Sequence, residues 1–191
     1  MIGMKNEDEL VEKALQGDGA SFEILLRPYR QGLLNMTYRM TGDLEEAKEI
    51  CQEALLKVFK YLDKFKKGKS FKNWFYSIVI NSAYDFLRRK KRYENIVEIQ
   101  KNFMSRADLN PEEQLMNKET KVKIELCLKN LSPKEKSVFL LRDGEGFSVK
   151  EAAEILGCSS MSVRAHLSRA RQKIRKQFEK IYPTPGKEVK E

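Results

Sequence analysis

Apolar residues recur at intervals of three and four along most of this chain, and this helical periodicity restricts its fold more than any other feature. Strand signals, in which alternating residues are bounded by Asn-Gly or Asp-Gly turns, are nearly absent. Capping boxes mark several helix starts, because a small polar residue and an acid three positions later satisfy free backbone N–H groups. They are Asn6/Glu9, Asp43/Glu46, Asn110/Glu113, Ser132/Glu135 and Ser148/Glu151. We therefore predict an all-α protein.

The 191 residues are predicted to form two small helical domains joined by a flexible linker. The first domain, residues 1–93, is expected to contain helices near 7–16, 21–40, 44–65 and 71–92, with a kink at Pro28. Residues 94–109 show no sustained period and are interpreted as the linker. The second domain, residues 110–182, is expected to contain helices near 111–130, 133–142, 149–156 and 160–178, followed by a disordered tail at 183–191.

Composition excludes several classes of function. The net charge is +9, which favours a polyanionic partner. His166 is the only histidine, the three cysteines are far apart, and neither phosphate-binding glycine motif occurs, so we predict no enzyme, no cofactor and no metal site. The start of the chain is polar and no apolar stretch is long enough to span a bilayer. We expect a cytoplasmic protein with reduced cysteines.

The C-terminal part of the sequence predicts a helix-turn-helix. A short capped helix ends at Gly157, and a long helix follows in which Val163, Leu167, Ala170 and Ile174 share one buried face. Six basic residues and no acid lie between Arg164 and Lys176. A solvated basic face is the alternative interpretation, but such faces usually mix charge signs for pairing along the helix.

DNA binding by this second helix is the favoured hypothesis, because a helix-turn-helix places the N-terminal end of its second helix at base edges. The residues expected to face the major groove are Ser159, Ser160, Met161, Ser162, Arg164, Ala165 and His166. Arg169, Arg171 and Arg175 are expected nearer to phosphates.

A second feature is the acidic first half of the helix expected at 44–65. Its predicted buried face consists of Ala47, Ile50, Cys51, Ala54, Val58 and Phe59. Glu45, Glu46, Glu49 and Glu53 lie beside a single Lys48. Two interpretations stay open here: acids favoured by the helix dipole, or a docking surface for another protein to which Gln52 adds a polar contact.

The helix expected at 71–92 interleaves aromatic and basic residues. Much of its aromatic content must form core, yet basic residues beside exposed rings are typical of single-stranded DNA binding, in which unpaired bases stack on the rings. The alternative interpretation is that the basic run Arg88–Arg92 only keeps the end of the helix soluble.

Taken in order, these segments resemble the sigma factors of bacterial RNA polymerase, in particular the small extracytoplasmic-function group. MTGDLEEAKEICQEALLKVFKYL resembles region 2.2, FKNWFYSIVINSAYDFLRRKKR resembles the promoter-melting segment, and LSPKEKSVFLLRDGEGFSVKEAAEILGCSSMSVRAHLSRARQKIRKQ resembles region 4. The resemblance covers about 6–93 and 110–178. Lys48, Met161 and His166 depart from the family's usual residues.

The resemblance implies a division of labour between the segments. Glu46, Glu49, Gln52 and Glu53 would dock on the clamp coiled coil of the largest subunit of core RNA polymerase. Lys69, Phe71, Trp74, Asn81, Tyr84, Asp85, Arg88 and Arg89 would bind and melt the -10 element of promoter DNA. The C-terminal helix-turn-helix would read the -35 element, and an anti-sigma factor would be a further partner.

Two other hypotheses remain at this point. A stand-alone helix-turn-helix regulator would need a dimer with paired half-sites, and the sequence shows no dimerisation heptad. A nuclease using paired carboxylates and Mg²⁺ would need clustered acids, whereas Asp85 and Asp143 are isolated from other acids in sequence.

Overall fold

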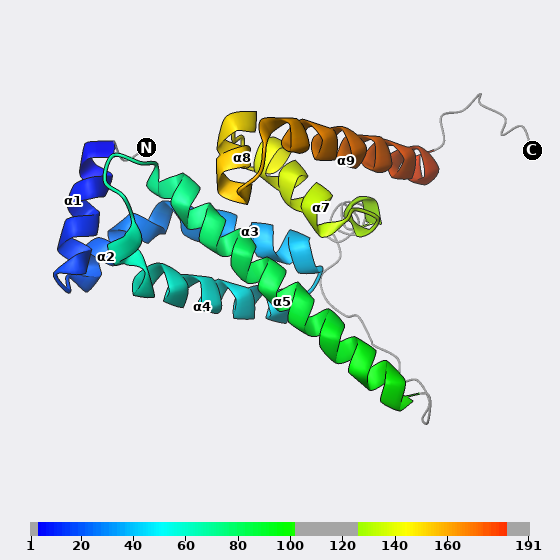
Figure 1. Cartoon of the computed structure of the whole chain (residues 1–191), viewed down its shortest axis with the longest axis horizontal. Helices are drawn as coiled ribbons and strands as arrows, with labels where there is room; N and C mark the ends of the chain where they lie inside the picture. The colour runs from blue at the N-terminus through cyan, green and yellow to red at the C-terminus, as the bar shows by residue number, and fades with distance from the viewer. Residues whose placement is uncertain (1–3, 102–125, 183–191) are drawn as a thin grey trace, which may run out of the picture.

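The protein, represented by a computed structural model that describes residues 4–101 and 126–182, is built from helices, and no strand occurs within those two ranges (Figure 1). The predicted all-α class is confirmed. None of the helices in these ranges has both the length and the apolar character needed to cross a membrane.

The N-terminal domain is a bundle whose core lies between α3, α4 and α5. Its elements are α1 (Met4–Leu15), α2 (Gly19–Leu26), η1 (Arg27–Tyr29), α3 (Arg30–Thr41), α4 (Leu44–Lys60), η2 (Leu62–Lys64) and α5 (Phe71–Lys101). Asp43 caps α4, since its carboxylate accepts a hydrogen bond from the backbone N–H of Glu46 at 2.9 Å. Phe71, Phe75 and Ile50 are fully buried in this core.

The C-terminal domain carries the predicted helix-turn-helix. Residues 126–129 are helical and are followed by α7 (Pro133–Phe139), the π-helical η3 (Leu140–Gly144), α8 (Val149–Leu156) and α9 (Ser160–Ile181). The capping boxes at Ser132/Glu135 and Ser148/Glu151 are both present. Gly157 ends α8 at φ 59°, a left-handed conformation that glycine adopts without a steric penalty.

Several predicted boundaries are wrong. Asn6 lies inside α1, which begins at Met4, so it does not cap that helix. Pro28 does more than kink the predicted second helix: it sits in a 3₁₀ turn that divides it into α2 and α3. The helix predicted to end near residue 92 continues to Lys101, through the start of the predicted linker. The Asn110/Glu113 cap, most of the helix predicted at 111–130 and the predicted tail lie outside the described residues.

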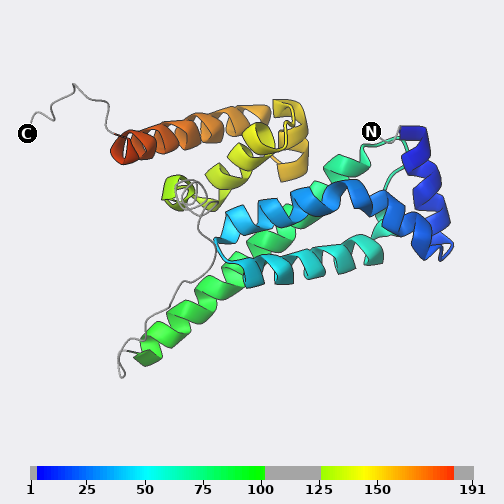
Figure 2. The ribbon, with the colours of Figure 1, turned by 180° about the vertical axis from the view of Figure 1, so that it is seen from behind.

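The two domains pack against each other. Helices α7, α8 and α9 lie along one side of the N-terminal domain, where α8 contacts α5 and α7 contacts α3. Helix α4 lies on the opposite side, as both views show (Figure 2). The arrangement therefore leaves α4 away from the C-terminal domain and places α8 directly on α5.

Candidate nucleic-acid interface

The second helix of the helix-turn-helix is held by the apolar face that the sequence predicted. Val163, Leu167 and Ala170 are buried and Ile174 packs against the same core. Ser159 caps α9, because its hydroxyl accepts a hydrogen bond from the backbone N–H of Ser162 at 3.1 Å. This face fixes the rotation of α9, and it leaves Arg164, Ser168 and Arg169 exposed to solvent.

The side chains expected in the major groove occupy the exposed N-terminal end of α9. Met161 is 78% exposed. Ser159 and Arg164 are also exposed, whereas Ser160, Ser162, Ala165 and His166 are partly buried. The Nδ1 atom of His166 is buried and has no hydrogen-bond partner among the described residues. Nδ1 is therefore not available to DNA.

The basic face of α9 is less free of acids than the sequence suggested. Arg171 forms two hydrogen bonds with Asp143 of η3, at 2.9 and 2.6 Å, and these raise the pKa of Arg171. Arg175 pairs with Glu179 at 3.0 Å. Among the described residues, Arg164 and Arg169 have no acidic partner. These two arginines can meet DNA without first breaking an ion pair.

A second basic surface lies at the N-terminal end of α5. Lys69 is exposed and Trp74 is half-buried. Together they line a cavity of about 280 Å³, and its wall also includes Lys64, Phe65, Lys66, Ser70, Asn73, Ser77, Glu154 and Ile155. A ring beside several lysines suits an unpaired base and its phosphates. Glu154 and Ile155 belong to α8, so the C-terminal domain forms part of this wall.

Further along α5, Asn81 and Arg88 are exposed and Asp85 is half-exposed. The carboxylate of Asp85 lies 3.6 Å from the Lys57 ammonium and 3.5 Å from the Arg88 guanidinium. Both of these partners are basic, whereas the nuclease hypothesis needs a second carboxylate beside Asp85. Among the described residues, no group of three or more His, Cys, Asp or Glu side chains is placed to hold a metal ion.

Phe71 and Tyr84 do not lie where the -10 hypothesis needs them. Phe71 is fully buried, with ring centroids 5.5 Å from Phe65 and 5.6 Å from Trp74. It cannot stack on a base, and it supports Trp74 from beneath instead. The half-buried hydroxyl of Tyr84 is hydrogen-bonded to Ser137 of α7. Tyr84 therefore faces the other domain in this arrangement.

The acidic residues of α4 are not separated from the basic run of α5. Glu53 accepts a hydrogen bond from Arg89 at 2.6 Å, which lowers the pKa of Glu53. Glu46 pairs with Lys90 at 2.5 Å, and its other oxygen is buried without a partner among the described residues. Arg89 is thereby occupied by an acid, although the -10 hypothesis assigned it to DNA.

The open face of α4 combines acids with apolar side chains. Phe59 was predicted to be buried but is 66% exposed, and Leu56 is 70% exposed. With Glu45, Glu49 and Gln52, they recur every three or four residues and so share one helix face. We call these five residues the α4 stripe. This spacing is present in the sequence, but Phe59 was predicted to be buried and was therefore not assigned to this face.

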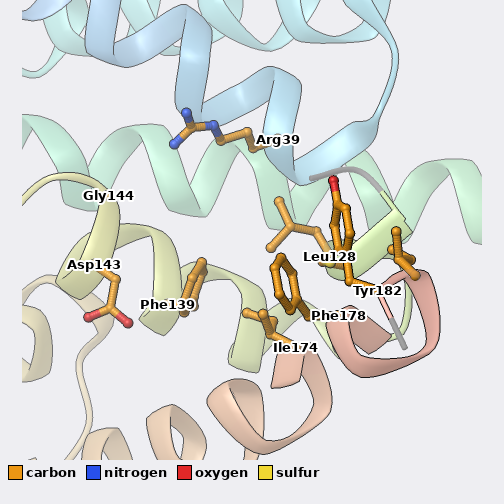
Figure 3. Close-up of a pocket in the computed structure, with 10 residues that line it drawn as sticks. Arg39, Leu128, Phe139, Asp143, Gly144, Ile174, Phe178 and Tyr182 are labelled. Carbon is orange, nitrogen blue, oxygen red and sulfur yellow. The ribbon is translucent and has the colours of Figure 1, made fainter. Parts of the chain in front are cut away.

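An apolar groove of about 400 Å³ lies beside the C-terminal half of α9 (Figure 3). Phe178 and Tyr182, with ring centroids 4.7 Å apart, are 54% and 44% exposed. The remaining lining residues are Cys127, Leu128, Phe139, Asp143, Gly144, Ile174, Ile181 and, from α3 of the other domain, Arg39. The groove is thus built from both domains.

Comparison with protein families identifies the chain. The family model described as "Sigma-70 region 2" matches residues 25–93, which include α4 and most of α5. The family model described as "Sigma-70, region 4" matches residues 121–174, which include α8 and most of α9. The chain belongs to the sigma-70 family of RNA polymerase sigma factors. Within that family it is an extracytoplasmic-function sigma factor.

Individual proteins agree with this assignment. The chain is 33% identical to RNA polymerase sigma factor YlaC of Bacillus subtilis, over 84% of this chain and 93% of the relative. It is 28% identical to the ECF RNA polymerase sigma-E factor of Escherichia coli, over 86% of this chain and 90% of the relative. The fold is similar to the solved co-crystal structure of sigma factor RpoE with anti-sigma factor NepR from Bartonella quintana, with TM-score 0.65, 23% identity and coverage of 83% of this chain and 96% of that chain.

Proposed function

We propose that this sigma factor binds core polymerase through the α4 stripe and binds promoter DNA through α9 and α5. The observation that supports the docking role is the exposure of Leu56 and Phe59 beside Glu49 and Gln52 on α4. This helix lies on the side of the N-terminal domain opposite the C-terminal domain (Figure 2). Exposed apolar side chains rimmed by charged ones are typical of a protein interface. A coiled coil of the polymerase's largest subunit would complement this stripe by presenting basic and apolar side chains to it.

The docking proposal is tested by affinity for core polymerase. Glu49→Lys reverses a charge and Phe59→Ala removes an exposed ring, and we expect each to weaken binding about tenfold or more. Glu9→Lys is the matched control, since Glu9 is an exposed glutamate of α1 that pairs with Lys13. Unchanged affinity in both stripe variants would contradict the docking role.

For DNA, we propose that α9 reads the -35 element and that the basic surface of α5 binds the melted -10 element. Arg164 and Arg169, which have no acidic partner in the described part of the chain, lie on an exposed helix face and support the first assignment. The lysine-rich cavity beside Trp74 supports the second. Phe71 is excluded as a base contact because it is buried.

Transcription in vitro tests the whole proposal. Core polymerase and a library of promoter fragments should give transcripts with defined starts only when this chain is added. The competing function, a stand-alone regulator, would instead show tight and specific duplex binding without polymerase. We also propose that residues 1–93 form the domain that binds polymerase and the -10 element, and that residues 110–182 form the domain that binds the -35 element.

Three further assignments follow. The relatives are sigma factors, so we propose that this chain contributes specificity and carries out no phosphoryl transfer itself. We propose that it acts in the cytoplasm, where polymerase and promoter DNA are found.

We also propose regulation by an anti-sigma factor, with the exposed rings of Phe178 and Tyr182 as an apolar binding surface. Phe178→Asp should then raise the level of transcripts that depend on this sigma factor in cells. Transcription by the purified variant and core polymerase should stay unchanged.

A further inference from the structure

Helix α1 lies beside the loop that joins α4 to α5, residues 61–70 (Figure 1). The loop contains a tight turn, in which the backbone N–H of Lys69 donates a hydrogen bond to the carbonyl of Lys66 at 3.1 Å. Gly68, within this turn, has φ 75°, a conformation that glycine adopts more readily than other residues. Lys66 and Lys69 line the basic cavity beside Trp74, so the turn is part of the proposed single-strand site.

Two acids of α1 hold this turn. The carboxylate of Asp8 accepts a hydrogen bond from the backbone N–H of Gly68, with its oxygens 3.3 and 3.4 Å from the nitrogen. Glu12 forms an ion pair with Lys67, and the hydrogen bond between them raises the pKa of Lys67. Among the described residues, these are the only hydrogen bonds and ion pairs that join residues 66–69 to another element. The position of the turn therefore depends on α1.

The four lysines of the loop are divided between the cavity and α1. Three of them line the cavity: Lys64, Lys66 and Lys69. Lys67 does not line it and pairs with Glu12 instead. No side chain of α1 in the described part of the chain belongs to the cavity wall. The contacts of α1 thus set where the neighbouring lysines lie, although α1 itself is not part of the cavity.

We propose that Asp8 and Glu12 are positioning residues for promoter melting, because they hold the turn so that its lysines face the backbone of the melted strand. The proposal rests on the assignment of the cavity to the -10 strand made above. Electrostatics alone predict that removing an acid near a basic surface favours DNA binding. A positioning role predicts the opposite sign, so the two explanations can be separated.

The test compares two variants of equal net charge. Asp8→Ala and Asp8→Asn each remove one negative charge, but only asparagine keeps a side-chain oxygen that can accept a hydrogen bond from Gly68. Alanine also favours a helix more than aspartate does, so Asp8→Ala should not loosen α1 itself. Glu9→Ala and Glu9→Gln are the matched control pair, since Glu9 pairs with Lys13 within α1.

Promoter opening is measured with the complete holoenzyme, on a promoter found in the transcription assay and labelled with a fluorescent base analogue in its -10 element. Asp8→Ala should lower the equilibrium constant for opening about threefold relative to Asp8→Asn, as expected for one ordinary hydrogen bond. Initial binding of the duplex promoter should be the same in both variants. The two Glu9 variants should not differ from each other. Equal opening by the two Asp8 variants would overturn the proposal.

Trp74 gives a second readout in the free chain, without DNA. It is the only tryptophan, and Phe65 of the loop packs on it with ring centroids 5.6 Å apart. Acrylamide should therefore quench Trp74 more strongly in Asp8→Ala than in Asp8→Asn. Reduced opening without this difference would overturn the proposal, because Asp8 would then not act through the loop.

A charge swap tests Glu12 and covers failure of Asp8→Ala to fold. Glu12→Lys should reduce opening about twofold to threefold, even though it makes the protein more positive. Combining it with Lys67→Glu should restore opening, since the ion pair is formed again at the original net charge. Increased opening in Glu12→Lys, or no restoration by the swap, would overturn the role of this pair.

Lys69→Ala distinguishes failure of the proposed site from failure of the positioning role. This variant should reduce opening, because Lys69 lines the cavity. Unchanged opening would show that the cavity does not bind the melted strand, and the role of α1 in melting would fail with it. Reduced opening in Lys69→Ala together with equal opening by the two Asp8 variants would overturn the positioning role alone.

Discussion

Gly32 of α3 lies against the hydrogen bond between the Tyr76 hydroxyl and Glu145, and Gly32→Ala tests how tightly the two domains are packed there. A Cβ at this position would lie 2.5 Å from the hydroxyl oxygen of Tyr76 and 3.2 Å from Oε2 of Glu145. Real Cβ atoms do not approach a neighbour at 2.5 Å, so the hydroxyl must move. The hydrogen bond between Tyr76 and Glu145 would then be lost or lengthened.

Two effects of opposite sign decide the result. Alanine in place of glycine inside a helix stabilises it by about 0.5–1 kcal/mol. Loss of a hydrogen bond to a charged group costs about 1.5–3 kcal/mol. The net change in the free energy of unfolding is therefore a loss of about 0.5–2.5 kcal/mol.

A double-mutant cycle separates these effects. In a Tyr76→Phe background the hydroxyl is absent, so Gly32→Ala should become neutral or stabilising by about 0.5–1 kcal/mol. Urea unfolding of the four proteins gives the four free energies. An equal cost of Gly32→Ala in both backgrounds would refute the reasoning, because it would show that the methyl group clashes with something other than the Tyr76 hydroxyl.

Three further predictions concern the DNA-binding surface, the ion pair between α4 and α5, and the core of the C-terminal domain. Arg164→Ala should weaken binding to the preferred -35 duplex by about 1–3 kcal/mol, and an equal loss on every sequence would assign Arg164 to a phosphate instead. Glu53→Gln should lower stability near neutral pH, and the difference should shrink as the pH falls below about 4, because the hydrogen bond from Arg89 lowers the pKa of Glu53 in the folded state and its contribution is lost when the carboxylate is protonated. A pH-independent difference in urea unfolding would contradict that cause. Leu141→Ala should cost about 2–5 kcal/mol in thermal or urea unfolding, since Leu141 is fully buried, and a cost below about 0.5 kcal/mol would mean that the core refills the cavity.

The helix-turn-helix was readily predicted because its signals are local. The capping box at Ser148/Glu151, the left-handed Gly157 and the apolar spacing of α9 each act within a few residues, and the structure confirms all three. Predictions that relied on a negative argument were less reliable. The absence of a clear apolar period after residue 92 was interpreted as a linker, yet α5 continues to Lys101.

The wrong predictions at the candidate sites have a common cause. A helical repeat shows which residues share a face of the helix, but it does not show which face meets the core. Phe59 follows the apolar pattern of α4 but lies on its exposed side. Phe71 has the residue type of a base-stacking side chain but lies on the buried side of α5. Packing against neighbouring helices fixes the rotation of each helix, and that rotation is not encoded in the period itself.

The sequence by itself determined the helical class, the helix-turn-helix, and the presence of acidic and basic segments, since all of these follow from short-range backbone and side-chain chemistry. The tertiary structure decided which charges stay free. Helices distant in sequence bring Arg89 to Glu53, Arg171 to Asp143 and Tyr76 to Glu145. Because ion pairs and domain contacts depend on distance in space, only the folded chain shows that Arg164 is available to DNA and that Glu154 and Ile155 of α8 form part of the wall of the cavity beside Trp74.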